Sequence, residues 1–330
     1  MWLHILIVLH LLASDIQLPS DFNERLTAIT GNNLPQVELL PQARPTLIDV
    51  PRVAAAPVKD AQAAKLAAQA KRAIVIDADS GAVLYSKNAD EPAAMASIAK
   101  LMVALVTLEE MESLDQVITV PKEILELEEA STLVGFVPGE KVRVSELLVG
   151  LLIASGNDAA LTLAHGLAGD EAGFVELMNA KAERLGLSGT HFVNSTGLDA
   201  KGHQSTAREV AYLLIEAGKV QRLRDLSQRA NATVTTESGS AYYVSSTDKL
   251  LGQTDLDVLL AKTGTTDEAG AAFTLLAERD GQRIAVVILD SPDRFTEAEH
   301  LVKAALDAFR WPDALAGTDA NGEEDSAFGG

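Results

Sequence analysis

The sequence predicts an α+β protein in which one antiparallel sheet is flanked by helices and joined to a mostly helical lobe. Segments with strand character lie at both ends of the ordered region, near residues 73–88 and 231–290. Apolar segments with helical character fill the chain between them. This order predicts a single sheet built from both chain ends, with the helices inserted on one side.

Residues 14–56 show no sustained helical or strand period. Residues 1–13 form an apolar run that is shorter than the ~20 residues needed to span a bilayer. The run is typical of a signal or anchor segment, although no basic residue precedes it. Residues 14–72 are punctuated by proline and are expected to be a linker. Their alanine-rich part, 57–72, is either a short helix or a continuation of the spacer.

Order is expected to begin at Ala73 with a hairpin that turns at residues 79–81. The next segment, MASIAKLMVALVTLEE at 95–110, is apolar on every side around Lys100, which is typical of a helix buried all round. The elements expected after it are short strands at 117–120 and 141–144, two apolar helices separated by Ser155-Gly156-Asn157, a helix at 171–186, and a helix capped by Ser205 or Thr206 with Glu209 completing a capping box.

The C-terminal part turns to strands. They are expected as a hairpin at 231–248, a strand ending in LLAKTGTT at 259–266, and two strands around Asp280-Gly281. An amphipathic helix at 297–311 closes the catalytic domain, which is expected to span 73–311. The acidic, glycine-rich residues 312–330 are expected to be disordered.

Composition excludes several classes of function. The formal net charge of −20 argues against nucleic acid as a partner, because no basic patch is available to neutralise phosphates. Cysteine is absent, so disulfides and thiolate metal sites are excluded. The six histidines are scattered without metal-ligand spacing, and no metal or other cofactor is expected.

Ser97 and Lys100 lie three residues apart and would share one face of the helix. Ser97 could simply cap the helix, and Lys100 could be a solvated first-turn residue. The apolar residues around Lys100 favour a different interpretation. Burial of a lysine favours its neutral amine and lowers its pKa. A neutral amine beside a serine hydroxyl is a general base next to a nucleophile.

Two further short motifs decide between these interpretations. Ser155-Gly156-Asn157 lies at a helix junction, and Lys262-Thr263-Gly264 lies at a strand end. Each alone is an ordinary turn or strand exit. In this order, with Ser97 and Lys100 upstream, they form the set of motifs that penicillin-binding proteins and class A β-lactamases share.

Over residues 73–311 the sequence resembles the serine D-Ala-D-Ala carboxypeptidases, the low-molecular-mass penicillin-binding proteins. The segments that carry the resemblance are VIDADSGAVLYSKNAD, ASIAKLM, LIASGNDAA, THFVNSTGL, HQSTARE and AKTGTTDEAG. The resemblance implies a transpeptidase/β-lactamase-like fold and removal of the terminal D-alanine from peptidoglycan stem peptides. It also implies β-lactam antibiotics as covalent inhibitors and an exported protein facing the periplasm or cell wall, with attachment, if any, through the N-terminus.

The expected catalytic residues are Ser97 as nucleophile, Lys100 as base and Ser155 as proton relay. Lys262 supplies a second cation that lowers the pKa of Lys100. The backbone N–H groups of Ser97 and Thr265 are expected to form the oxyanion hole, and the strand 260–265 to pair with an extended peptide. The substrate-binding residues are expected to be Asn157, Lys262, Thr263, Gly264, Thr265 and Arg294, of which Arg294 matches a family arginine.

Thr265 is a departure, because family members often carry an aromatic residue or histidine there. A D,D-endopeptidase that cleaves cross-links with the same residues remains the alternative. A β-lactamase is disfavoured, because Glu176 and Asn179, which resemble a deacylation loop, lie in a periodic helical run. A non-enzymatic penicilloyl-binding or scaffolding protein is disfavoured because all motif residues are present.

Overall fold

The computed structural model describes residues 54–127 and 131–312. The expected segment 1–13, residues 14–53 of the expected linker and the tail from residue 313 lie outside the described residues. Within 54–127 and 131–312, none of the helices combines the length and the apolar character that a bilayer crossing requires.

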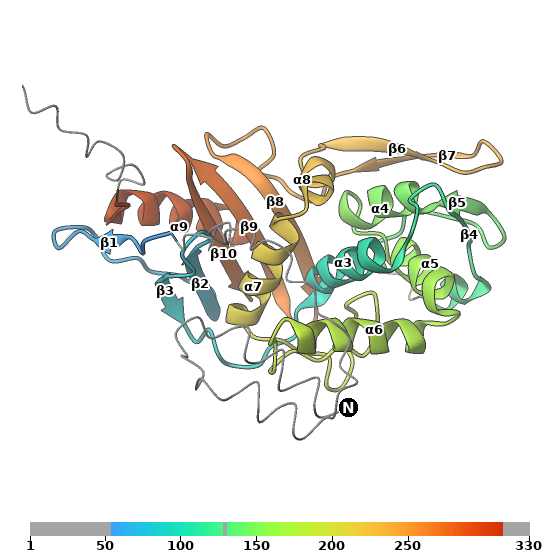
Figure 1. The fold of residues 1–330 in the computed structure, drawn as a ribbon, viewed down its shortest axis with the longest axis horizontal. Coiled ribbons are helices and arrows are strands. Elements are labelled where there is room, and N and C mark those ends of the chain that lie inside the picture. The colour runs from blue at the N-terminus through green and yellow to red at the C-terminus, as the bar shows by residue number, and fades with distance from the viewer. Residues whose placement is uncertain (1–53, 128–130, 313–330) are drawn as a thin grey trace, which may run out of the picture. The chain divides into compact units, whose positions relative to one another are not determined.

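A five-stranded antiparallel sheet forms the centre of the described unit (Figure 1). Its order is β3-β2-β10-β9-β8. The strands are β2 (Arg72–Asp77), β3 (Val83–Lys87), β8 (Asp257–Thr266), β9 (Gly270–Arg279) and β10 (Gln282–Leu289). Because β2 pairs with β10, both ends of the domain contribute to one sheet, and the prediction from the order of the elements is confirmed.

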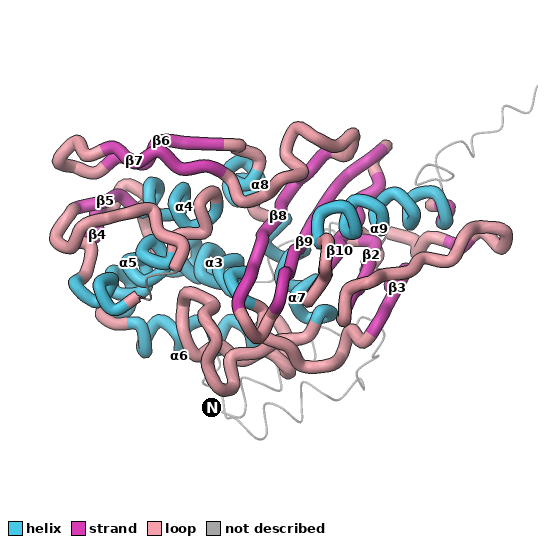
Figure 2. Tube along the Cα trace, turned by 180° about the vertical axis from the view of Figure 1, so that it is seen from behind, coloured by secondary structure: helices cyan, strands magenta, loops and turns pink. Residues whose placement is uncertain are grey.

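Successive side chains of the sheet enter two different cores. On β10, Ala285 and Val287 belong to the cluster that includes α7 (Ala207–Gly218), whereas Ile284 and Val286 belong to the cluster under α9 (Arg294–Ala308). Helix α7 lies in front of the sheet in Figure 1, and α9 lies in front in the opposite view of Figure 2. Both faces are therefore covered, which explains why β9 and β10 are buried almost continuously instead of at every second residue.

The helical lobe lies on the β8 side of the sheet (Figure 1). Its central helix, α3 (Lys100–Glu110), is buried at every position from Lys100 to Thr107, as the sequence predicts. The other elements of the lobe are η1 (Ala96–Ala99), β4 (Val117–Thr119), η2 (Lys122–Glu126), β5 (Lys141–Arg143), α4 (Val144–Leu152), α5 (Asn157–Ala168), α6 (Glu171–Arg184), and the hairpin of β6 (Asn231–Thr235) and β7 (Ala241–Ser245).

Only half of the expected capping box forms at the start of α7. Thr206 Oγ1 accepts a hydrogen bond from the backbone N–H of Glu209 at 3.1 Å. The Glu209 carboxylate instead accepts from Gly189 N and Thr190 Oγ1, and so ties the helix to the preceding loop. The short helix α8 (Gln221–Ser227) follows α7 and was not expected, because seven residues are too few to show a helical period.

The alanine-rich residues 57–72 form no helix in the structure. Val58–Lys59 instead forms the strand β1, which pairs with β11 (Phe309–Arg310). Ala70 is fully buried in the cluster under α9. This part of the expected linker therefore lies against the sheet. Helix α9 begins three residues earlier than expected and brings Arg294 into its first turn.

Candidate active site

Ser97 lies in the short helix η1 directly ahead of α3, half-buried, with Lys100 one turn later. Lys100 Nζ and Ser97 Oγ are 2.8 Å apart. Neither η1 nor α3 has a side-chain cap among the residues that the structure describes. The alternative in which Ser97 caps the helix is therefore wrong, and the Ser97 hydroxyl contacts the amine of Lys100 instead.

The turn that presents Ser97 is strained and held from two sides. Ala96 has a φ of +49°, in the left-handed region that is rare for residues other than glycine. A Cβ added to Gly197 would lie 2.1 Å from Ala96 O, and one added to Gly264 would lie 2.8 Å from Ala96 Cβ. Strain of this kind persists only where the surroundings fix it, and it is common at active sites.

The amine of Lys100 is enclosed by acceptors. The residue is 0% exposed, and Nζ donates to Asn157 Oδ1 at 2.6 Å and to the backbone O of Thr196 at 2.5 Å. Both oxygens can only accept hydrogen bonds. In the neutral amine, these two acceptors would take both N–H groups, and the lone pair would then face the Ser97 hydroxyl.

The surroundings of Lys100 favour that neutral form. Burial is the main cause that holds its pKa well below the usual range, and the charge of Lys262 acts in the same direction. The Asp158 carboxylate opposes them. Asp158 also accepts backbone N–H bonds from Val134, Gly135 and Phe136, and so fixes the loop before β5.

Ser155 and Lys262 form a second hydroxyl–amine pair. Lys262 Nζ donates to Ser155 Oγ at 2.7 Å and to Thr263 O at 3.0 Å. Burial, followed by the charge of Arg294, lowers the pKa of Lys262 to about 7. Ser155 has a φ of +62°, so a second strained residue lies at a motif position.

The edge strand β8 runs past Ser97. A Cβ on Gly264 would lie 3.2 Å from Ser97 N, so only glycine allows the strand to approach this closely. β8 is the last strand of the sheet, and Thr265, next to Gly264, is exposed. The geometry brings the backbone of 264–265 beside the Ser97 N–H, where the sequence predicts an oxyanion hole and a peptide-binding edge.

Arg294 reaches the same strand from the first turn of α9. Its Nη1 donates to Gly264 O and Thr265 Oγ1, both at 2.7 Å, and to Ala272 O at 3.2 Å. The structure therefore groups the predicted residues from four separate parts of the chain: Ser97 and Lys100, Ser155 and Asn157, Lys262 to Thr265, and Arg294.

Sequence reasoning missed the residues that support Lys100 and Thr263. The Thr196 carbonyl is positioned by Asn194, whose Oδ1 accepts from Thr196 Oγ1 and Gly197 N. Thr247 Oγ1 lies 2.6 Å from Thr263 Oγ1. The polar run VNSTGL was the available signal for the first loop, but nothing in the sequence shows that Thr196 would act through its backbone.

The two residues of the rejected β-lactamase interpretation lie on α6. Glu176 is exposed there. Asn179 Nδ2 donates a hydrogen bond to the backbone O of Phe192, and Asn179 Oδ1 accepts one from the backbone N–H of Phe192. The side chain of Asn179 therefore has a structural role.

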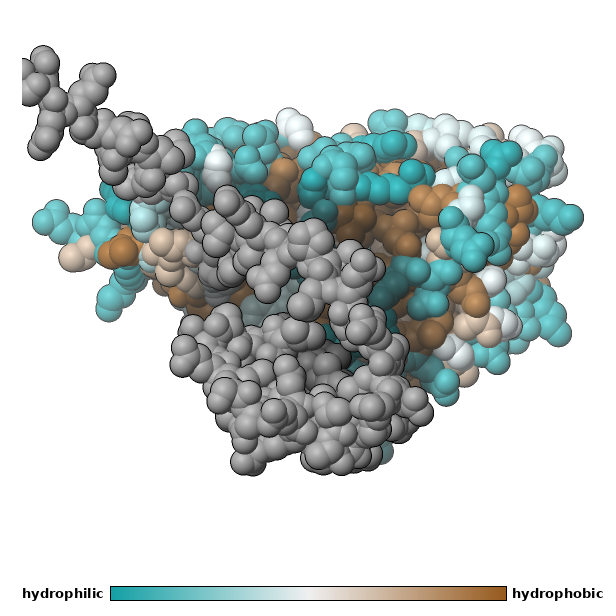
Figure 3. Space-filling model, in the orientation of Figure 1, coloured by the Kyte–Doolittle hydropathy of each residue, from teal (hydrophilic) through white to brown (hydrophobic). Residues whose placement is uncertain are grey.

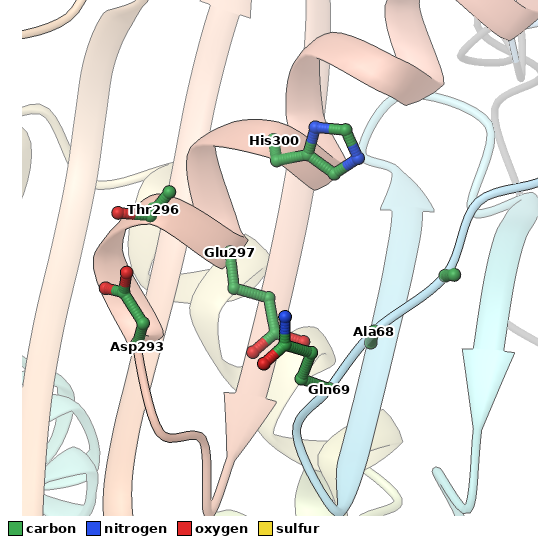
Figure 4. Close-up of a pocket in the computed structure, with 7 residues that line it drawn as sticks. Ala68, Gln69, Asp293, Thr296, Glu297 and His300 are labelled. Carbon is green, nitrogen blue, oxygen red and sulfur yellow. The ribbon is translucent and has the colours of Figure 1, made fainter.

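A cavity of about 320 Å³ lies between the first turns of α9 and the segment that precedes β2 (Figure 4). It is formed by residues 67–69 and by Asp293, Thr296, Glu297 and His300. None of the predicted site residues lines it. The candidate active site is therefore the cluster of predicted residues where the helical lobe meets β8.

A family model described as D-alanyl-D-alanine carboxypeptidase, peptidase S11, matches residues 58–293. The chain belongs to the peptidase S11 family. Among S11 relatives, it is 35% identical over 229 residues to D-alanyl-D-alanine carboxypeptidase DacF of Bacillus subtilis, a match that covers 68% of this chain and 58% of that protein. It is 33% identical over 226 residues to the D-alanyl-D-alanine endopeptidase of Pseudomonas aeruginosa, which covers 68% of this chain and 72% of that one.

Solved structures support the S11 fold. A D-alanyl-D-alanine carboxypeptidase from Mycobacterium tuberculosis is 29% identical with a TM-score of 0.69, and the match covers 76% of this chain and 96% of that one. A Streptomyces DD-transpeptidase is 26% identical with a TM-score of 0.67, covering 74% and 98%. The expected transpeptidase-like α+β fold is confirmed.

Proposed function

We propose that this protein is a serine D,D-carboxypeptidase that removes the terminal D-alanine from peptidoglycan stem peptides through an acyl-enzyme. The observation that carries the proposal is the contact of Ser97 Oγ with a buried amine whose other two contacts are acceptors only. That amine is a ready proton acceptor for the hydroxyl.

In the proposed acylation step, Lys100 Nζ takes the proton of Ser97 as Oγ attacks the carbonyl carbon of the penultimate D-alanine. The oxyanion that forms is stabilised by the backbone N–H groups of Ser97 and Thr265. The proton passes from Lys100 through Ser155 and Lys262 to the leaving amine; Lys100 contacts the Ser97 hydroxyl, and Lys262 contacts the Ser155 hydroxyl. The C–N bond then breaks and free D-alanine leaves.

In the proposed deacylation step, a water molecule gives one proton to Lys100 and its oxygen attacks the ester carbon. The bond from that carbon to Ser97 Oγ then breaks, Lys100 returns the proton to Oγ, and the shortened peptide leaves as a carboxylate. The substrate pairs with β8 as an added strand, and Asn157 holds its backbone. Thr263, Thr265 and Arg294 bind the terminal carboxylate. β-Lactam antibiotics, which present an amide and a carboxylate, acylate Ser97 in the same way.

The proposed substrate lies outside the cytoplasm, and the protein therefore acts there. We further propose that residues 1–13 attach the protein to the membrane. Fractionation of cells that express the full chain, with and without residues 1–13, tests it. Loss of membrane association on deletion is expected, and unchanged association would contradict it.

The decisive experiment for the activity combines two measurements. Labelled penicillin should form one adduct, located at Ser97 by mass spectrometry, and a soluble pentapeptide ending in D-Ala-D-Ala should release D-alanine. Ser97→Ala should lose both. An adduct at any other residue, or an adduct without peptide hydrolysis, would contradict the carboxypeptidase.

A D,D-endopeptidase is the second candidate. It is supported by the similarity to the Pseudomonas endopeptidase, a match that covers 72% of that protein. Cross-linked dimeric muropeptides distinguish the two activities. Conversion of dimers to monomers with little release of D-alanine from the pentapeptide would favour the endopeptidase.

A further inference from the structure

The hairpin of β6 and β7 exposes one face that carries no charged residue. Alternate residues of the two strands are exposed and lie opposite one another in the register. These outward residues form three cross-strand pairs: Asn231 with Ser245, Thr233 with Tyr243, and Thr235 with Ala241. We call these six residues the hairpin face.

The hairpin face differs from the rest of the surface. The chain has a net charge of −20 and 22% charged residues, yet the hairpin face offers only hydroxyls, methyl groups, one amide and one phenol ring. Much of the edge where Figure 1 places the hairpin is pale in Figure 3, between hydrophilic and hydrophobic. Tyr243 is 70% exposed at the centre of the face, which is unusual for a large aromatic ring without a partner.

The hairpin is held rigidly on the lobe. Val234 and Val244, on its inner side, are buried in the main core. Tyr242 Oη donates to Glu140 at 2.7 Å, and Glu237 near the turn pairs with Arg143 at 2.8 Å. The hairpin face is therefore preorganised, so little conformational entropy would be lost when a ligand binds to it.

These features fit a carbohydrate. A sugar ring presents a face of C–H groups, which pack on an aromatic ring, and a rim of hydroxyl or acetamido groups, which pair with threonine, serine and asparagine side chains. A phosphate or acidic ligand would need a cation, and the hairpin face has none. A cationic ligand would need a carboxylate, which the face also lacks.

The hairpin face is connected directly to the active site. Two residues after β7, Thr247 Oγ1 lies 2.6 Å from Thr263 Oγ1 on β8, and Thr247 N donates to Ile153 O at the end of α4. Tyr243 and Thr247 are four residues apart, which is at most about 14 Å of chain. A stem peptide of about five residues extends over roughly 17 Å, which is comparable with the length of chain that joins Tyr243 to the contact with β8.

We propose that the hairpin face binds the glycan part of the wall polymer, a strand of uncharged N-acetylated sugars, while the attached stem peptide lies along β8. This inference rests on the proposed function. It predicts that polymeric substrate binds more tightly than an isolated stem peptide, and that Tyr243 accounts for much of the difference.

Binding is measured first, without catalysis. The full chain carrying Ser97→Ala is titrated with β-1,4-linked N-acetylglucosamine oligomers and sedimented with wall polymer from which the stem peptides have been removed. Adding Tyr243→Ala is expected to weaken binding about tenfold, the scale of one lost aromatic contact. Tyr243→Trp should retain binding. Tyr212→Ala removes an exposed tyrosine on α7 and is the matched control, with no loss expected.

Thr233→Glu is a second variant that introduces a charge opposite Tyr243 without removing the ring. It should also weaken binding, while thermal unfolding shows that both variants are folded. Failure of the oligomers and of the stripped polymer to bind, or equal binding by Tyr243→Ala and the parent, would overturn the inference. Binding only to a protein or lipid component of crude wall would overturn it as well.

Hydrolysis separates this inference from the proposed function. Tyr243→Ala should release D-alanine from a soluble pentapeptide at the rate of the unsubstituted protein, but more slowly from polymeric wall. If neither substrate is hydrolysed by the unsubstituted protein, the proposed function fails. If both are hydrolysed and Tyr243→Ala affects neither, only the hairpin inference fails.

Discussion

Three cations lie at the active site, and each of two of them lowers the pKa of the next. Arg294 helps to lower the pKa of Lys262, and Lys262 helps to lower the pKa of Lys100, although burial is the larger cause for both lysines. The positive charge of Arg294 therefore acts on the Ser97–Lys100 pair through Lys262. The proposed chemistry needs a neutral Lys100 and a charged Lys262 at the same pH.

This requirement predicts a bell-shaped pH profile for acylation of Ser97 by penicillin. The rate should rise as Lys100 loses its proton and fall as pH passes the Lys262 pKa of about 7. Arg294→Gln removes a cation beside Lys262, so the pKa of Lys262 should rise and the alkaline limb should move to higher pH.

Acylation rates between pH 5 and 10 test this prediction. Arg294→Lys keeps the charge and should leave the alkaline limb in place, even if both variants acylate more slowly because contacts with β8 are lost. An unmoved limb in Arg294→Gln would show that Lys262 is not the group that titrates there.

The sequence allows the prediction of side-chain chemistry better than that of backbone chemistry. The burial of Lys100 could be predicted because its neighbours on every side of the helix are apolar. The acceptor at Thr196 could not, because a backbone carbonyl carries no residue signature and its loop is distant in sequence. Arg294 reaches β8 because α9 begins earlier than its periodicity indicates.

At the scale of elements, the turn before α3 depends on Gly197 and Gly264, two glycines from other parts of the chain. Gly197 has a φ of +85°, and a side chain there would overlap the backbone of Ala96. Gly186 has a φ of +73°, but a Cβ there would meet nothing within 4 Å. Both glycines have the left-handed backbone conformation, and the two positions differ only in whether a side chain would overlap its neighbours.

Gly197→Ala should therefore destabilise the protein by about 3 kcal/mol or more, whereas Gly186→Ala should cost only the ~1–2 kcal/mol of the left-handed conformation. Thermal unfolding measures both costs. Gly197→Ala should also slow penicillin acylation, because the turn that carries Ser97 must shift. Equal losses of stability, with acylation unchanged, would contradict this account of the turn.

The sequence predicted the periodic elements well and the short ones poorly. The buried α3, the helices around Ser155 and the C-terminal hairpins follow from hydrophobic period and turn residues. The seven-residue α8 and the two-residue β1 carry no period, and β1 exists only because β11 pairs with it. The capping-box role predicted for Glu209 was wrong, because the loop at Gly189 competes for its carboxylate.

At the scale of the whole described unit, the sheet separates the contact of the segment after α9 with β2 from the candidate active site at β8. Trp311 Nε1 donates at 2.9 Å to Asp77 Oδ1, which lies at the end of β2. Asp77 is 1% exposed. In the sheet, β2 lies three strands from β8, or roughly 14 Å at the usual strand spacing. The C-terminal segment should therefore affect stability and not acylation.

Trp311→Phe tests this separation, because it keeps an aromatic ring against the core under α9 but removes the donor to a buried carboxylate. An unpaired buried acceptor costs about 1–3 kcal/mol, which lowers the melting temperature of a domain of this size by roughly 5 °C. Arg310→Ala removes a surface ion pair with Asp60 and hydrogen bonds of an exposed side chain to nearby backbone carbonyls, and it should change stability by less than about 1 kcal/mol. Penicillin acylation should be unchanged in both variants. If Trp311→Phe slowed acylation in proportion to its loss of stability, β2 and β8 would be coupled across the sheet, and the anchoring of the chain ends would belong to the active site.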